Sequence, residues 1–104
     1  MSNWRSPALL RHARDQSCVN CGAEDGTVVA AHSNRSIHGK GAMIKAHDCF
    51  IAFLCARCHS WLDQGGGSDP TGMWTVKEKD EFFDRNKDKT ILRLFQQGKL
   101  KVMT

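Results

Sequence analysis

The chain has 104 residues, a formal charge of +4 and 25% charged residues, so we expect one small domain over residues 1–104. Its longest apolar run, Cys49 to Cys55, is too short to span a membrane, and the amino terminus has no apolar segment typical of a secretory signal. We therefore expect an intracellular protein without membrane contact. The mild positive charge is compatible with nucleic acid but does not establish it.

The first half of the sequence predicts a short helix, a tight turn and a strand. Ser6-Pro7 is typical of a helix start, so we expect a helix over Ala8 to Arg14. The run Cys18 to Gly22 predicts a metal-binding knuckle in which the glycine adopts unusual backbone angles. Thr27 to Ala31 is β-prone and ends at His32. We expect a loop over residues 33–47, which are polar and basic.

The middle of the sequence predicts a strand that runs directly into a helix. Cys49 to Leu54 is apolar and β-prone, with Cys49 expected in the core. We expect a helix over Ala56 to Gln64, ended by Gly65-Gly66-Gly67. A turn over Asp69 to Gly72 should follow.

The last third predicts one long helical segment. Thr75 to Glu78 is a capping-box pattern, and apolar residues at helical spacing continue to a stop near Gly98. The charged stretch Asp84 to Lys89 is expected to break this helix into two. Leu100 to Val102 predicts a last edge strand.

Two Cys-x-x-Cys pairs carry the strongest chemical signal in the chain. Cys18 and Cys21 are followed by 33 residues and then by Cys55 and Cys58. Zinc takes four such ligands in a tetrahedron, and one turn supplies two of them. The alternatives are a redox pair or buried free thiols, but paired knuckles in a reducing compartment more often hold metal. We expect one structural Zn²⁺ with no open coordination position.

A second metal site is predicted on the helix that follows the second knuckle. His59 and Asp63 stand at positions i and i+4, so they share one helix face. This mixed nitrogen and oxygen pair suits Mg²⁺ or Mn²⁺. The alternative is a surface His–Asp pair that stabilises the helix.

His32 and Asp48 complete the set of predicted catalytic residues. A histidine at the end of a strand can take a proton from the water that attacks a phosphodiester. Asp48 would orient the His32 imidazole or serve as a further metal ligand. The alternatives are a structural histidine and an ordinary turn aspartate.

Basic residues suggest a track for phosphate groups. Arg35, Lys40 and Lys45 give the predicted loop its positive charge, with His38 among them. Arg5, Arg11 and Arg14 add charge at the amino terminus. The alternative is an ordinary solvated loop.

With these residues in view, the chain resembles the HNH, or His-Me finger, nucleases. The run Leu54-Cys55-Ala-Arg-Cys58-His59 is similar to their Leu-Cys-x-x-Cys-His signature. The resemblance implies a ββα unit braced by zinc, with His32 as the base and with His59 and Asp63 as ligands of the catalytic metal. Ala31 stands where many members carry another ligand. More narrowly, the chain is similar to small prophage-encoded nucleases, which implies a bacterial cytoplasm.

The expected fold is α+β, a treble-clef core with flanking helices. The expected function is a metal-dependent DNA endonuclease in phage recombination or DNA processing, acting as a homodimer or with a recombination protein. The alternative is a zinc-braced DNA-binding or adaptor module that cuts nothing. A cross-brace interaction finger is disfavoured because it needs two zinc sites and interleaved ligands.

Overall fold

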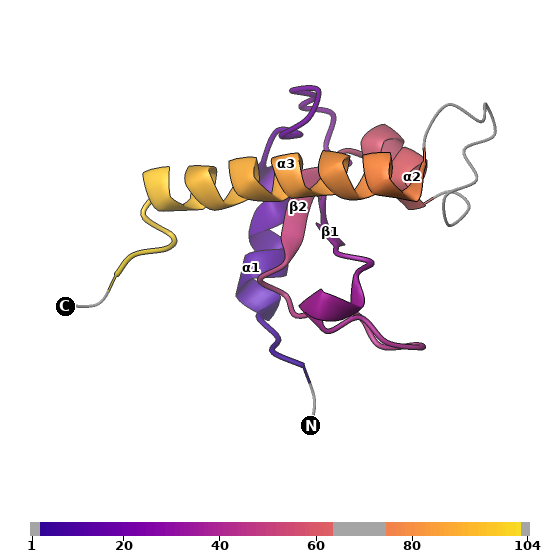
Figure 1. Ribbon diagram of the computed structural model, residues 1–104. Helices are drawn as coiled ribbons and strands as arrows, with labels where there is room; N and C mark the ends of the chain where they lie inside the picture. The colour runs from indigo at the N-terminus through magenta and orange to yellow at the C-terminus, as the bar shows by residue number, and fades with distance from the viewer. Residues whose placement is uncertain (1–2, 64–74, 103–104) are drawn as a thin grey trace.

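A two-stranded antiparallel sheet lies at the centre of the protein, whose computed structural model describes residues 3–63 and 75–102. Strand β1 (Val29–His32) pairs with β2 (Ile51–Leu54), and His32 stands opposite Ile51. Three α-helices accompany this sheet, so the predicted α+β class is confirmed. Figure 1 shows the longest of them, α3, crossing the sheet near β2.

The two short helices begin where their sequence signals lie. Helix α1 (Pro7–His12) starts at Ser6, whose hydroxyl accepts the Leu9 amide at 3.3 Å. A 3-10 turn, η1 (Ala13–Asp15), replaces the last turn of the predicted helix. Helix α2 (Ala56–Asp63) follows β2 after one residue, as the sequence predicted.

Helix α3 (Val76–Gln96) is continuous over 21 residues, so the predicted break within Asp84–Lys89 was wrong. The stretch stays helical because Asn86 packs inward on the same side as the core residues of the helix, while Arg85, Asp88 and Lys89 are exposed. The capping box between Thr75 and Glu78 is confirmed at the start. A Schellman motif ends the helix. Gly98 has a φ of +71°, and the Lys99 amide donates to the Leu94 carbonyl at 2.9 Å.

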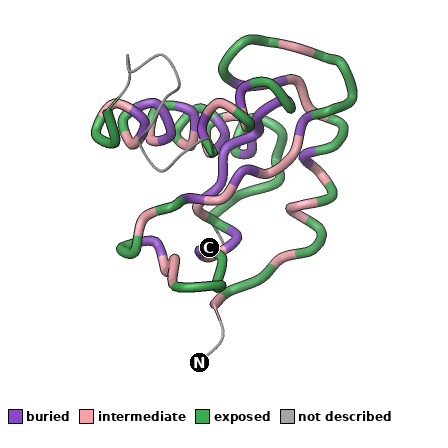
Figure 2. Tube along the Cα trace, turned by 90° about the vertical axis from the view of Figure 1, so that its right-hand side faces the viewer, coloured by how far each residue is buried: buried purple, intermediate pink, exposed green. Residues whose placement is uncertain are grey.

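The core forms where α3 packs on β2. All four residues of β2 are buried, and Phe82, Phe83 and Leu94 of α3 are buried with them. Figure 2 shows the buried positions running along the strands and along one side of α3. Burial of β2 on both faces explains why its sequence is continuously apolar rather than alternating.

Within residues 3–63 and 75–102 no third strand pairs with the outer edge of β2, and the hydrogen-bonding groups of this edge contact a side chain and a loop instead. The Phe53 amide donates to the Thr90 hydroxyl at 3.1 Å, and the Phe53 carbonyl accepts the Val19 amide at 2.9 Å. The Thr90 hydroxyl in turn donates to the Asn86 carbonyl at 2.8 Å. Because a buried backbone amide without a partner is costly, Thr90 fixes α3 against the sheet.

Other sequence expectations fail or fall outside the structure. Leu100–Val102 forms no strand, and Val102 is exposed. Cys49 is exposed rather than in the core, because it lies in the turn before β2 begins. The predicted helix stop at Gly65–Gly67 and the turn at Asp69–Gly72 lie outside the described residues. Over 3–63 and 75–102, every helix is too short or too polar for a bilayer span.

Replacing Thr90 by valine should destabilise the protein by about 1–3 kcal/mol, because the buried Phe53 amide loses its acceptor. Thr90→Ser keeps the hydroxyl and serves as the matched control. Urea denaturation followed by circular dichroism measures both variants. Equal stability of Thr90→Val and Thr90→Ser would show that this hydrogen bond contributes nothing.

Candidate functional site

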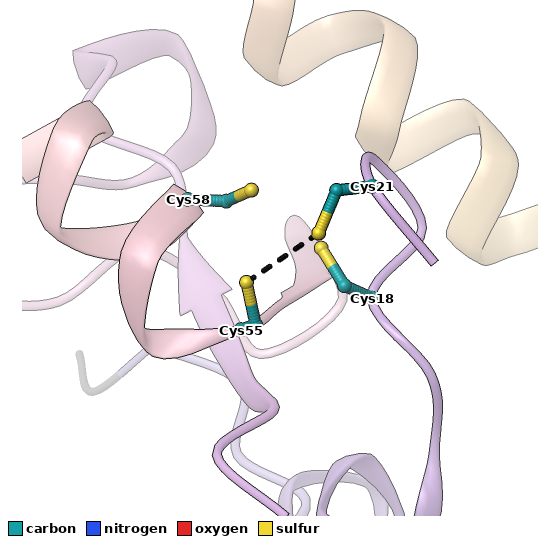
Figure 3. Close-up of side chains that lie close together, drawn as sticks. All are labelled: Cys18, Cys21, Cys55 and Cys58. Atoms are coloured by element: carbon teal, nitrogen blue, oxygen red, sulfur yellow. Dashed lines mark hydrogen bonds between the residues drawn. The ribbon is translucent and has the colours of Figure 1, made fainter. Parts of the chain in front are cut away.

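The four predicted zinc ligands come together at one point. One ligand atom from each of Cys18, Cys21, Cys55 and Cys58 lies within 4.8 Å of all the others. Figure 3 shows the four side chains pointing toward one another, two from the first knuckle and two from the start of α2. The Sγ atoms of Cys21 and Cys55 are 3.7 Å apart. Sulfur atoms around a tetrahedral zinc with bonds of about 2.3 Å lie about 3.8 Å apart, so the cluster is arranged to bind a metal ion such as zinc.

Local backbone geometry places each pair of thiols. In the first knuckle the Gly22 amide donates to the Cys18 carbonyl at 2.9 Å, and Gly22 takes a φ of +79° that a side chain would strain. Cys55 stands just before α2, and its carbonyl accepts the His59 amide at 2.9 Å as the helix begins. Cys58 therefore projects from the first turn of α2 back toward Cys55.

Burial and hydrogen bonds distinguish the four thiols. Cys18, Cys55 and Cys58 are buried, whereas Cys21 is exposed. Burial of Cys18 opposes ionisation, but hydrogen bonds from the backbone of Cys21, Cys55 and Asn20 lower its pKa to about 7. Burial raises the pKa of Cys58 to about 12. A metal ion must displace the proton from Cys58, so binding releases protons and weakens as pH falls.

An amide chain connects the cysteine cluster to α3. The Asn20 side chain donates to Cys58 Sγ at 3.4 Å, and the Asn86 side chain donates to the Asn20 oxygen at 3.4 Å. Asn86 is 1% exposed. Hydrogen bonds of this kind orient a ligand and stabilise its thiolate form. Sequence reasoning missed both asparagines, although Asn20 stands inside the first Cys-x-x-Cys pair.

A cleft of about 540 Å³ between β1, the loop and α2 contains most of the other candidate residues. His32 lines it from the end of β1, and His59 and Asp63 line it from α2. Lys40 and Lys45 contribute from the loop. Arg14, Ser33 and Asn34 also line the cleft, and the last two were not predicted, although they follow His32 directly in sequence.

The predicted His59–Asp63 pair is formed. The His59 Nε2 atom lies 2.9 Å from an Asp63 carboxylate oxygen, and both side chains are partly exposed. Neighbouring ligands of an octahedral ion with bonds of about 2.1 Å lie about 3 Å apart. At this spacing one octahedral ion could contact both the imidazole nitrogen and the carboxylate oxygen. It also fits the alternative of a helix-stabilising ion pair.

His32 and Asp48 form a hydrogen bond, as expected from the first of the two roles that the sequence analysis gave Asp48. The His32 Nε2 atom lies 2.8 Å from Asp48 Oδ1, and the Asp48 side chain is 1% exposed. Burial of Asp48 opposes ionisation, but hydrogen bonds from His32, the Ser6 amide and Arg5 lower its pKa below the usual range. Both carboxylate oxygens are occupied by protein donors. Asp48 thus orients His32 and does not line the cleft as a metal ligand.

An ionised Asp48 fixes the chemical state of His32. A carboxylate only accepts hydrogen bonds, so His32 Nε2 must carry the proton that it donates. In the neutral imidazole Nδ1 then has a free lone pair. Because His32 lines the cleft, Nδ1 is the nitrogen left to accept a proton from a bound molecule.

Arg35 and His38 do not belong to the cleft. Arg35 forms ion pairs with Asp84 at 3.3 Å and Asp80 at 3.9 Å, so acidic groups of α3 offset its charge. His38 is buried against Phe50 with ring centroids 4.4 Å apart, and desolvation lowers its pKa. The expectation that His38 adds positive charge to the loop was therefore wrong. It is a structural residue.

A larger cavity of about 820 Å³ lies between the loop and α3. Arg35, Lys79 and Asp80 line it, and it meets the cleft at Asn34 and Asp63. It contains neither His32 nor His59. Size alone would favour this cavity, but the smaller cleft is the one that holds His32 and the His59–Asp63 pair.

Replacing Cys55 by serine should abolish tight zinc binding and unfold the protein or cost several kcal/mol of stability, roughly the contribution of a structural zinc. Cys49→Ser is the matched control, because Cys49 lies outside the cluster. Metal analysis of purified protein should find one zinc per chain in wild type and in Cys49→Ser. A Cys55→Ser variant that lacks zinc but is as stable as wild type would contradict the structural role of the metal.

Comparison with known proteins places the chain in a family without an assigned activity. Residues 1–67, which include all four clustered cysteines and the cleft residues His32, His59 and Asp63, match the family described as "Protein of unknown function (DUF968)". The match ends before α3 begins. Neither the curated proteins nor the solved structures gave a match. Because the match covers more than half of its length, the chain belongs to the DUF968 family.

Proposed function

We propose that the protein is a metal-dependent DNA endonuclease of the His-Me finger type. The observation that carries this proposal is the placement of His32, held by buried Asp48, in the same cleft as the His59–Asp63 pair. A proton acceptor and a metal-binding pair in one cleft are the groups that metal-assisted phosphodiester hydrolysis needs.

The order of elements supports the assignment of a ββα-metal unit. His32 ends β1, β2 returns beside it, and α2 then carries His59 and Asp63. The second cysteine pair lies where β2 passes into α2, and this position supports the assignment of a treble clef. We assign the cysteine cluster to a structural Zn²⁺ and the His59–Asp63 pair to a catalytic Mg²⁺ or Mn²⁺.

The residues of the cleft divide the chemistry between them. His32 Nδ1 takes one proton from water, and the water oxygen forms a bond to phosphorus while the bond to the leaving oxygen breaks. The leaving oxygen takes its proton from solvent. His59 and Asp63 would hold a divalent ion, which would stabilise the negative charge that develops on the phosphate. Asp48 keeps Nε2 protonated and stabilises the imidazolium that forms.

DNA is the proposed substrate because the cleft is cationic at its rim. Lys40, Lys45 and Arg14 line it together with the catalytic candidates. Such side chains bind phosphate oxygens and align the backbone without reading sequence. A role in recombination or DNA processing in a bacterial cell fits this activity and the resemblance to prophage nucleases.

His32→Ala should lower the rate of plasmid nicking by about 10²–10⁴-fold, the usual contribution of a general base, and leave zinc content unchanged. His12→Ala is the matched control, because His12 does not line the cleft. Its side chain forms a hydrogen bond with Gln97 instead. The assay uses purified protein with Mg²⁺ or Mn²⁺ and with EDTA.

Two results would contradict the proposal in different ways. Full nicking by His32→Ala would remove this histidine from the mechanism. Absence of nicking by folded, zinc-loaded wild-type protein, across several metals and DNA forms, would favour a non-catalytic DNA-binding or adaptor module instead.

A further inference from the structure

Arg5 contacts the same carboxylate that orients His32, the side chain of Asp48. Its Nη1 atom lies 3.1 Å from Asp48 Oδ1, the same oxygen that His32 Nε2 contacts at 2.8 Å. The Ser6 amide donates to Asp48 Oδ2 at 2.6 Å. Three donors, two of them from the amino-terminal segment, therefore converge on one buried aspartate.

The charge balance at Asp48 depends on Arg5. A carboxylate that is 1% exposed needs a compensating cation, since burial of an unpaired charge is costly. His32 supplies positive charge only when it is protonated, whereas a guanidinium is always charged. Arg5 therefore keeps Asp48 ionised during the part of a reaction in which His32 is neutral.

We propose that Arg5 is a positioning residue for His32, acting through Asp48, in an inference that rests on the proposed nuclease function. Arg5 is thereby assigned to the support of the base rather than to the phosphate track expected from sequence. Both of its Nη atoms are already engaged within the protein, since Nη2 donates to the Lys45 carbonyl at 2.8 Å and Nη1 also donates to the Ala46 carbonyl.

The same contacts tie the amino-terminal segment to the loop that borders the cleft. The Asn3 amide group donates to the carbonyls of Gly39 at 2.7 Å and Lys45 at 2.8 Å. Asp48 donates its own amide to the Trp4 carbonyl at 3.0 Å. Gly39 has a φ of +92°, and a Cβ there would lie 2.8 Å from the His47 ring, so the loop packs tightly at the position that Asn3 contacts. Arg5 thus fixes Asp48 in position as well as in charge.

The inference has a spectroscopic consequence at His32 that is independent of cutting. With Arg5 present, Asp48 accepts from Nε2 and the imidazole holds a single neutral tautomer with Nδ1 bare. Without Arg5, the Ser6 amide and His32 are the remaining donors to Asp48, and the carboxylate is free to turn or to take up a proton. The two neutral tautomers of His32 then mix.

The test compares Arg5→Met, Arg5→Lys and Arg85→Met in the zinc-loaded protein. Arg85→Met removes the same charge from an exposed side chain of α3 that lies outside the cleft. Nitrogen-15 NMR of the imidazole reports the His32 tautomer. Plasmid nicking reports kcat and KM, and circular dichroism with metal analysis reports folding.

Arg5→Met is expected to mix the His32 tautomers and to lower kcat about ten-fold to a hundred-fold, the usual cost of losing a group that orients a functional side chain, with KM changed little. Arg5→Lys should restore the single tautomer and most of kcat. Arg85→Met should match wild type in both the tautomer and kcat. If Arg5→Met fails to fold, the Arg5→Lys tautomer and kcat decide the question alone.

Results of two kinds would overturn the inference. An unchanged His32 tautomer in Arg5→Met would show that Arg5 does not act through Asp48, and a rise in KM alone would make Arg5 a substrate contact. If wild type cuts no DNA, the proposed function fails. The tautomer comparison still shows whether Arg5 positions His32.

Discussion

The convergence of four thiols on one point is the constraint on which the rest of the structure depends. It joins the knuckle at Cys18 to the start of α2 at Cys55, and the strands and the loop lie between these two anchors. Because Cys58 must point toward the cluster, the rotation of α2 about its axis is set. His59, the next residue, and Asp63, one turn later, are then directed into the cleft rather than the core. A structural metal would in this way orient the side chains of the cleft without binding any of them.

A buried carboxylate is the second constraint. Asp48 accepts hydrogen bonds from a backbone amide, a guanidinium and an imidazole, which lower its pKa. The ionised carboxylate therefore stabilises the folded state fully above the unfolded pKa of about 4. This stabilisation is lost as pH falls through the lower pKa of the folded state. The residue connects three segments that are distant in sequence. Removing one donor would leave charge uncompensated in the core, which costs more than the lost hydrogen bond itself. The amino-terminal segment therefore helps to hold His32 in position at the cleft.

Short-range patterns in the sequence were sufficient to predict several local structures and several residues of the candidate site. The cysteine pairs, the capping box at Thr75 and the i, i+4 pair on α2 depend on local geometry, and the structure contains all three. The failures involve long-range packing. Asp84–Lys89 looked like a break because its charges dominate the sequence, yet α3 continues since Asn86 packs inward. Arg5 and Arg35 looked alike as surface cations, and only the fold shows that both pair with aspartates. No local signal distinguishes such arginines from Lys40 and Lys45, which line the cleft.

We propose two metal sites with separate roles, one formed by four cysteines and one by His59 and Asp63. Anomalous diffraction from crystals grown with zinc and soaked in Mn²⁺, with data collected at both absorption edges, distinguishes the two sites. We expect a zinc peak at the centre of the cysteine cluster and a manganese peak within about 2.3 Å of His59 and Asp63, facing His32. A cleft without manganese at saturating concentration would overturn the catalytic assignment, and the zinc assignment would be unaffected.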